Sequence, residues 1–270
     1  MSASRLLAAL GLAAAVAACT NTPSGRSQLL LVSDSQMNQM GATAFAQMKA
    51  NDKLSVVPEK SVYAQCIVNA LVAELPDEWR RLQWEAQAFA IAEPNAFALP
   101  GGKVGINTGL LRVATDQDQL AAVLAHEVAH VTYRHAGERV SQQQLAQTGM
   151  ALANAYAGRN ASPNETKLLM AAMGAGVQVG VLLPFSRAHE SEADIAGQAL
   201  MARAGFDPAA AVTLWQNMRE ASGKQGRPPQ ILSTHPDPGR RIEALQANVS
   251  KLQPVVQQAR AAGKRPSCRG

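Results

Sequence analysis

The sequence predicts an α+β fold that is mainly helical: a buried helix bundle with a small antiparallel β-sheet beside it. Hydrophobic residues make up 47% of the chain and aromatic residues only 4%, and the abundant alanine is the best helix former. Long segments repeat apolar residues at helical spacing, whereas one segment rich in proline and glycine separates short extended pieces. With 270 residues, the chain is long enough for one well-packed domain.

The first 18 residues are typical of a secretory signal peptide, in which a basic residue precedes the apolar stretch Leu6 to Val16. This stretch is too short for a stable membrane span. Residues 16–19, VAAC, resemble the bacterial lipobox, in which the cysteine, here Cys19, is lipidated. An ordinary signal with an incidental cysteine is the alternative. Thr20 in place of aspartate favours the outer membrane, by resemblance to enterobacterial sorting rules.

The remaining chain is expected to form a tether, one domain and a tail. Residues 19–35 are polar and contain proline and glycine, which predicts a flexible tether before the domain at 36–255. Residues 256–270 form a basic tail that is a solvated end or is attracted to an anionic membrane surface. In an oxidising compartment Cys66 and Cys268 could form a disulfide, and two independent thiols are the alternative.

The first half of the domain combines helices with the extended pieces. Apolar spacing predicts one or two helices within residues 36–75, and partial alternation from Leu82 to Ile91 predicts a strand. The breakers between Ala92 and Leu111 then bracket short strands. Thr115, with Asp118 three residues later, resembles a capping box. It predicts the start of a helix that is apolar nearly all round and therefore buried.

The next segments are also expected to be helical. A polar helix is predicted around Val140 to Tyr156. Residues Leu168 to Phe185 then form an apolar run interrupted only by Gln178 and three glycines. We expect a buried or membrane-touching helix there, and a transmembrane helix is the alternative.

Helix signals define the last third of the domain. One helix is expected from near His189 to Gly205, which would be a left-handed cap. Asp207 and Pro208 are expected to be the N-cap and first residue of the next helix. A final helix is expected to start around Pro238.

The predicted buried helix contains three ionisable residues within the otherwise apolar segment AAVLAHEVAHVTYRH, residues 121–135. His126 and His130 are four residues apart, so their side chains project from one helix face, and Glu127 follows the first. HExxH on a helix is a zinc-binding signature in which the histidines bind the metal and the glutamate acts on water. Two core histidines bonded to backbone carbonyls are the alternative.

A catalytic zinc needs a third protein ligand and an open position. Glu190 and Asp194 are four residues apart in SRAHESEAD and share a helix face. Glu190 would bind the metal, while Asp194 would accept a hydrogen bond from a ligand histidine and fix its tautomer. An ordinary acidic first helical turn is the alternative. His135 and His189 do not fit the ligand spacing and receive no role.

Four motifs, HEVAH, SRAHESEAD, STHPDPGRRI and the upstream PNAFALPGG, resemble the HtpX and CAAX-prenyl-protease family of zinc metallopeptidases. The layout is most similar to its soluble envelope branch, typified by BepA and LoiP, over roughly residues 80–245. The resemblance implies a helical bundle with a small antiparallel sheet beside the active-site cleft. It also implies one Zn²⁺ held by His126, His130 and Glu190, with Glu127 as the general base.

The resemblance further implies a role near the cleft for His235, with Arg241 behind it. His235 could stabilise the developing oxyanion, or act as a fourth zinc ligand that holds the enzyme inactive, or do both. A loop histidine before a helix is the structural alternative.

The leading functional hypothesis is a lipid-anchored periplasmic zinc endopeptidase that hydrolyses unfolded or misassembled envelope proteins. Residues Asn95 to Leu99 are expected at the sheet edge, where an extended substrate could add through main-chain hydrogen bonds. One alternative is a chaperone-like assembly factor for outer-membrane proteins with weak or latent proteolysis. Another is an integral membrane protease, if residues 168–185 span the bilayer. The net charge of +5 comes without a nucleic-acid-binding motif, so no nucleic-acid partner is expected.

Overall fold

The computed structural model describes residues 19–51, 55–160, 162–177, 183–225, 235 and 238–269. The predicted signal peptide lies outside the described residues. The chain forms two compact units: the smaller comprises Met1–Gln36 and Arg134–Ala188, and the larger comprises Met37–Tyr133 and His189–Gly270. Nothing in the sequence pattern predicted this division. The prediction of a mainly helical α+β fold is confirmed.

The larger unit contains a three-stranded sheet with the order β3 (Glu85–Phe89), β5 (Lys103–Asn107) and β4 (Ala96–Leu99). β4 and β5 form an antiparallel hairpin. Its turn contains Gly101 and Gly102 with φ angles of 85° and 77°, a conformation that residues with a side chain rarely adopt. β5 pairs with β3 in parallel, so the sheet is mixed rather than antiparallel as predicted. The hairpin lays its second strand against β3, which leaves β4 at the edge.

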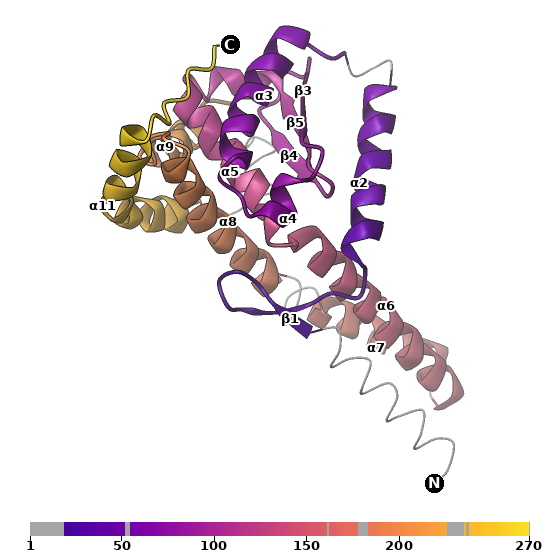
Figure 1. The fold of residues 1–270 in the computed structure, drawn as a ribbon. Coiled ribbons are helices and arrows are strands. Elements are labelled where there is room, and N and C mark those ends of the chain that lie inside the picture. The colour runs from indigo at the N-terminus through magenta and orange to yellow at the C-terminus, as the bar shows by residue number, and fades with distance from the viewer. Residues whose placement is uncertain are drawn as a thin grey trace. The chain divides into compact units, whose positions relative to one another are not determined.

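Helices surround this sheet in the larger unit (Figure 1). α2 (Asp34–Lys49) leads into it from the smaller unit, and the short α4 follows α3. α3 packs against β3, and α5 packs against α3, β4 and α9, which itself contacts α11. The bounds of these elements are α3 (Pro58–Val72), α4 (Asp77–Arg80), η1 (Thr108–Arg112), α5 (Gln117–Thr132), α8 (Leu183–Arg203), α9 (Ala210–Gln225) and α11 (Pro238–Ala261).

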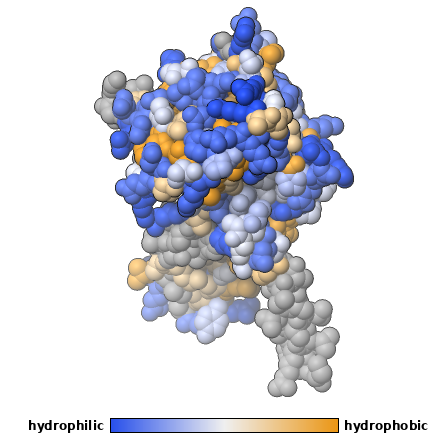
Figure 2. Space-filling view, turned by 60° about the vertical axis from the view of Figure 1, so that its left-hand side comes forward, coloured by the Kyte–Doolittle hydropathy of each residue, from blue (hydrophilic) through white to orange (hydrophobic). Residues whose placement is uncertain are grey.

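The predicted buried helix is α5, which is enclosed on nearly every side. Leu120, Leu124 and Val128 have no exposed surface, and burying each such side chain stabilises the fold by about 1.5–3 kcal/mol. The helix is capped by Asp116, whose carboxylate accepts a hydrogen bond from the Gln119 N–H at 2.8 Å. The prediction that Thr115 caps this helix is therefore wrong by one residue, because the N-cap is Asp116. This core contrasts with the visible surface, which is largely hydrophilic (Figure 2).

Two helices are described within the apolar run Leu168 to Phe185, and residues 178–182 between them lie outside the described residues. α7 (Pro163–Val177) ends within it, and α8 starts at Leu183, earlier than the predicted start at His189. Leu168 is 74% exposed, so the start of this run is not buried. Among the described residues, no helix has the length and apolar character needed to cross a bilayer. α8 ends as predicted before Gly205, which has a φ of 88°.

The smaller unit combines a two-stranded hairpin with two long helices. Residues 19–35, predicted to be a tether, contain β1 (Cys19–Asn21) and β2 (Ser27–Leu29), which pair antiparallel. The hairpin is tied to α6 (His135–Asn160) by Arg26, which donates to both carboxylate oxygens of Glu138 at 2.7 and 2.8 Å. Glu138 is 1% exposed, and removing one partner of a buried ion pair is strongly destabilising. The N-terminal hairpin is thus part of the folded unit.

The C-terminal segment is fastened to the larger unit. α11 continues to Ala261, so the first residues of the predicted tail are helical. Cys268 forms a disulfide with Cys66 of α3. The Gln117 side chain, at the start of α5, accepts a hydrogen bond from the Cys268 N–H and donates one to the Pro266 carbonyl, both at 2.9 Å. The end of the chain therefore connects α3 with α5.

Candidate metal centre

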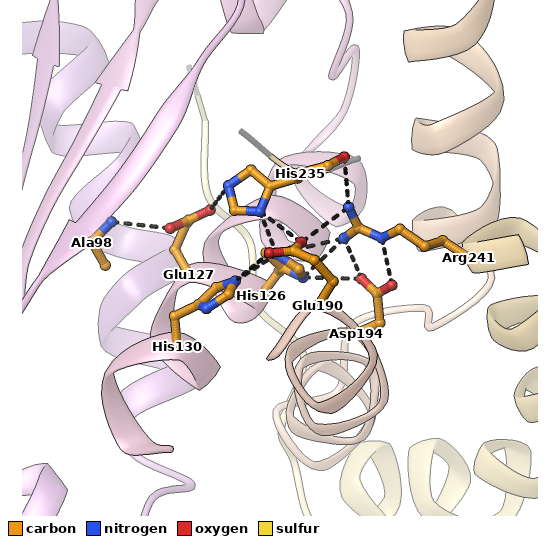
Figure 3. A network of polar contacts seen from close by, with 8 residues as sticks. All are labelled: Ala98, His126, Glu127, His130, Glu190, Asp194, His235 and Arg241. Atoms are coloured by element: carbon orange, nitrogen blue, oxygen red, sulfur yellow. Dashed lines mark hydrogen bonds and ion pairs between the residues drawn. The ribbon is translucent and has the colours of Figure 1, made fainter. Parts of the chain in front are cut away.

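α5 brings His126, Glu127 and His130 together in the larger unit. The two imidazoles lie one helical turn apart, with their Nε2 atoms 3.0 Å from each other. Glu127 is 4% exposed, and its Oε2 accepts a hydrogen bond from the Ala98 N–H of the edge strand β4 at 3.1 Å. The Glu127 side chain therefore reaches from α5 to the edge strand of the sheet, as Figure 3 shows.

α8 contributes the two carboxylates that the spacing predicted. Glu190 lies 3.4 Å from His126 Nε2 and 3.6 Å from His130 Nε2. Asp194, one turn later, accepts a hydrogen bond from His126 Nδ1 at 2.9 Å if that nitrogen carries the proton. α8 can approach this closely because Gly197 faces α5: a Cβ atom there would lie 2.8 Å from the His126 backbone nitrogen. Sequence reasoning did not single out Gly197.

His235 and Arg241 complete the cluster (Figure 3). His235 Nδ1 lies 2.7 Å from Glu190 Oε2, and His235 Nε2 lies 3.4 Å from Glu127 Oε1. The Arg241 guanidinium donates two hydrogen bonds of 2.6 Å to Asp194 and one of 3.2 Å to the His235 carbonyl. It also stacks 3.8 Å above the ring of Trp215 in α9. Nothing in the sequence marked Trp215 as part of the site.

The donor atoms fit a metal ion. One ligand atom from each of four residues lies within 4.8 Å of all the others: His126, His130, Glu190 and His235. Among the described residues, Oε1 of Glu127 and Oε1 of Glu190 are buried without a hydrogen-bond partner. Leaving such oxygens unpaired is costly, and a cation held by the donor group would satisfy the oxygen of Glu190. Three imidazoles and one carboxylate, which make four donors in all, suit zinc.

The charges of the cluster also favour a divalent cation. Glu127, Glu190 and Asp194 are all nearly buried, and when ionised they carry three negative charges against the single positive charge of Arg241. A dication brings this buried sum to zero. Unbalanced charge at such a depth is strongly unfavourable, so the donor set and its charge lead to the same kind of ion.

The pKa values of the cluster show which groups carry charge when no metal is bound. Burial disfavours the charged form of His126, but hydrogen bonds with Asp194 and Glu190 outweigh it and raise its pKa to about 9. Burial also opposes ionisation of Glu190, yet His126 and His235 hold its pKa well below the usual range. Burial raises the pKa of Glu127. At neutral pH His126 is therefore protonated without metal, and metal binding must release that proton.

The structure thus brings together the seven residues predicted for the site and its surroundings: His126, Glu127, His130, Glu190, Asp194, His235 and Arg241. His135 and His189 are both buried, but neither belongs to the donor group. The expected edge position of residues 95–99 is confirmed, since β4 is an edge strand and Ala98 contacts Glu127.

Comparison with known proteins agrees with this geometry. The sequence pattern of peptidase family M48 matches residues 58–249. The chain is 41% identical to the mitochondrial metalloendopeptidase OMA1 of Schizosaccharomyces pombe over 165 residues, which are 61% of this chain and 46% of that protein. It is 31% identical to the beta-barrel assembly-enhancing protease of Escherichia coli K12 over 228 residues, 83% of this chain and 46% of that protein.

The matches cover less than half of the length of these two relatives. The family match includes the whole metal-binding cluster, because residues 58–249 contain both the HExxH helix and the segment with Glu190, His235 and Arg241. The matched region and the zinc-compatible donor set lead to the same assignment. The chain belongs to peptidase family M48.

Proposed function

We propose that this chain is a zinc endopeptidase that hydrolyses unfolded or misassembled proteins of the bacterial envelope, with Glu127 as general base. The observation that carries the proposal is the position of Glu127. Its carboxylate reaches both the edge strand and the donor group, and its Oε1 has no hydrogen-bond partner among the described residues. A buried carboxylate that lies beside metal ligands and keeps one oxygen without a hydrogen bond suits proton transfer better than a structural role.

His126, His130 and Glu190 would hold the zinc, and Asp194 would keep His126 in the tautomer that binds it. Bound zinc supplies Lewis-acid chemistry: it polarises the scissile carbonyl and makes water more acidic. Glu127 takes the proton from the attacking water and passes it to the leaving amine. Burial raises the pKa of Glu127, so its carboxylate takes up a proton more readily than an exposed glutamate does.

The edge strand supports an extended polypeptide as substrate. The Ala98 N–H already donates to the Glu127 carboxylate rather than to β5, so this edge of β4 faces the site. A substrate strand that adds there would be held by main-chain hydrogen bonds, which read little side-chain sequence. An unfolded chain can supply such a strand, whereas a folded protein cannot, and this favours a role in protein quality control.

His235 provides a specific reason to consider a latent enzyme. A catalytic zinc keeps one coordination position open, whereas four protein ligands close the site. His235 is the fourth member of the donor group and contacts both Glu190 and His126. With His235 bound, proteolysis would be weak, and the chain would act mainly as an assembly factor for outer-membrane proteins. The name of the Escherichia coli relative, a beta-barrel assembly-enhancing protease, accords with this second function.

Replacing His235 by alanine is therefore expected to speed up peptide cleavage several-fold while zinc remains bound by the other three ligands. Zinc content by atomic absorption and initial rates on an unfolded protein would be measured for both forms. Arg240→Ala, one residue before Arg241, is the control for a nearby change. Slower cleavage with zinc retained would assign His235 to oxyanion stabilisation instead.

We further propose a lipoprotein in the periplasm, anchored at the outer membrane through Cys19. The lipobox-like VAAC supports the anchor, and the Cys66–Cys268 disulfide suits an oxidising compartment. In a bacterial host, labelled palmitate is expected on the parent chain and not on Cys19→Ser. Equal labelling of both would contradict lipidation at this residue.

The peptidase proposal is tested directly with the purified chain. We expect zinc-loaded protein to cut a reduced, unfolded protein into fragments, and chelation followed by return of zinc to abolish and restore the cleavage. A zinc-loaded chain, including its His235→Ala form, that never cleaves would refute the proposal and leave only the assembly function.

A further inference from the structure

A small apolar cavity lies beside the metal-binding residues, between α5 and α9. Its volume is about 10 Å³, close to the room that a single water molecule needs. α5 lines it with Ala122 and Val123, and α9 lines it with Leu214, Trp215 and Met218. The remaining wall consists of the imidazoles of His126 and His235.

The cavity shares two wall residues with the donor group. Ala122 and Val123 precede His126 by four and three residues, so they lie on the same face of α5 as that ligand. His126 and His235 belong both to the donor group and to the wall of the cavity. A peptide carbonyl placed at the donor group would therefore have its neighbouring side chain within reach of the cavity.

The wall of the cavity is held rigidly to the metal ligands. Trp215 stacks on the Arg241 guanidinium at 3.8 Å, and Arg241 makes two hydrogen bonds of 2.6 Å to Asp194. Asp194 is in turn bonded to His126. Trp215 and Met218 are 5% and 0% exposed. A pocket held in this way does not need to reorganise when a side chain enters, which favours selectivity.

We propose that this cavity is the subsite for a small apolar side chain next to the scissile peptide bond, and that Ala122 and Met218 limit its size. The inference rests on the proposed peptidase function. A charged substrate side chain would be excluded, because burying an unpaired charge among these residues is strongly unfavourable. A hydrophobic pocket discriminates between side chains that differ by one methylene by roughly 10- to 200-fold in kcat/KM.

Mapping the cleavage sites of an unfolded protein by mass spectrometry tests this. For the parent chain we expect alanine or a similarly small apolar residue at one fixed position beside the cut bonds. Met218→Ala enlarges the cavity and should shift the preference toward leucine by roughly 10-fold or more in kcat/KM, measured on paired peptides. Ala122→Val fills the cavity and should lower kcat/KM for the alanine peptide while sparing a glycine peptide.

Met201→Ala is the matched control, because Met201 is also 0% exposed but lies in α8 and does not line the cavity. It should lose similar stability and keep the parent preference. Thermal melting would verify folding first, and Ala122→Val, which adds volume, serves if Met218→Ala does not fold. Calorimetric binding of the same peptides to Glu127→Gln should show the same order of preference without catalysis.

Two outcomes would overturn the subsite. One is cleavage without a preferred residue at any fixed position. The other is a residue preference that stays the same in Ala122→Val and Met218→Ala, as it is expected to do in the control Met201→Ala. Either result leaves the peptidase function intact. Failure of the zinc-loaded parent and His235→Ala chains to cleave any substrate would instead refute the peptidase function, and the subsite with it.

Discussion

Replacing Glu127 by glutamine is expected to lower the rate of peptide cleavage by roughly 10²- to 10⁴-fold, the usual contribution of a general acid–base group, without loss of zinc. Glutamine has nearly the same shape, and its amide oxygen can still accept the Ala98 N–H. It cannot take a proton from water at neutral pH. The donor group is formed by other residues, so metal binding should survive. Zinc content and cleavage rate would be measured on the same preparations.

Glu192→Gln is a matched control for this change. Glu192 lies on α8 between Glu190 and Asp194 but outside the donor group, so its replacement should leave both zinc and cleavage unchanged. Cleavage at the parent rate by zinc-loaded Glu127→Gln would show that another group accepts the proton. Loss of zinc from Glu127→Gln would show that Glu127 supports the ligands and would leave its catalytic role to be measured at saturating zinc.

The chemistry of the site could be predicted largely from sequence because its residues follow helical spacing. His126 and His130 recur four apart on one helix, and Glu190 and Asp194 do the same on another. Each pair shares a face, and the cost of burying their charges favoured the reading in which the two faces meet around a cation over the structural alternatives. The motif with His235 and Arg241 was placed by its resemblance to a known family, and the structure brings both residues into the cluster.

Other features depend on contacts through space that no local pattern records. The stacking of Trp215 on Arg241 joins two helices whose sequences carry no sign of it. Gly197 is one glycine among 20 in the chain, and only the approach of α8 to the backbone of His126 explains it. The parallel pairing of β3 with β5 depends on which strand of a hairpin docks, and alternation of side chains is the same in both cases.

The early start of α8 and the N-terminal hairpin are a third group that sequence could not settle. A run of apolar residues does not mark the residue at which a helix begins, and α8 begins at Leu183, before the expected start near His189. Residues 19–35 have the composition of a tether, but Arg26 finds the buried Glu138, more than a hundred residues away in sequence. Composition predicts solvation and cannot anticipate such a long-range ion pair.

Removing the Cys66–Cys268 disulfide is expected to lower the free energy of unfolding by about 2–5 kcal/mol. The bridge joins residues 202 apart, and the chain-entropy relation gives about 5 kcal/mol for a loop of this length. For a protein of this size the melting temperature should fall by roughly 5 to 20 °C. The double replacement Cys66→Ala and Cys268→Ala would be compared with the parent by calorimetry, and Cys19→Ala, which changes an exposed cysteine outside the disulfide, is the control.

This loss should affect stability far more than chemistry. The bridge ties the C-terminal segment to α3. Gln117, the first residue of α5, also binds this segment and lies more than two helical turns before His126. Zinc binding and cleavage well below the melting temperature should therefore be retained in the double variant. A reducing agent should lower the melting temperature of the parent to that of the double variant and leave the variant unchanged. Equal melting temperatures for the double variant and Cys19→Ala would mean that the bridge does not stabilise the folded chain.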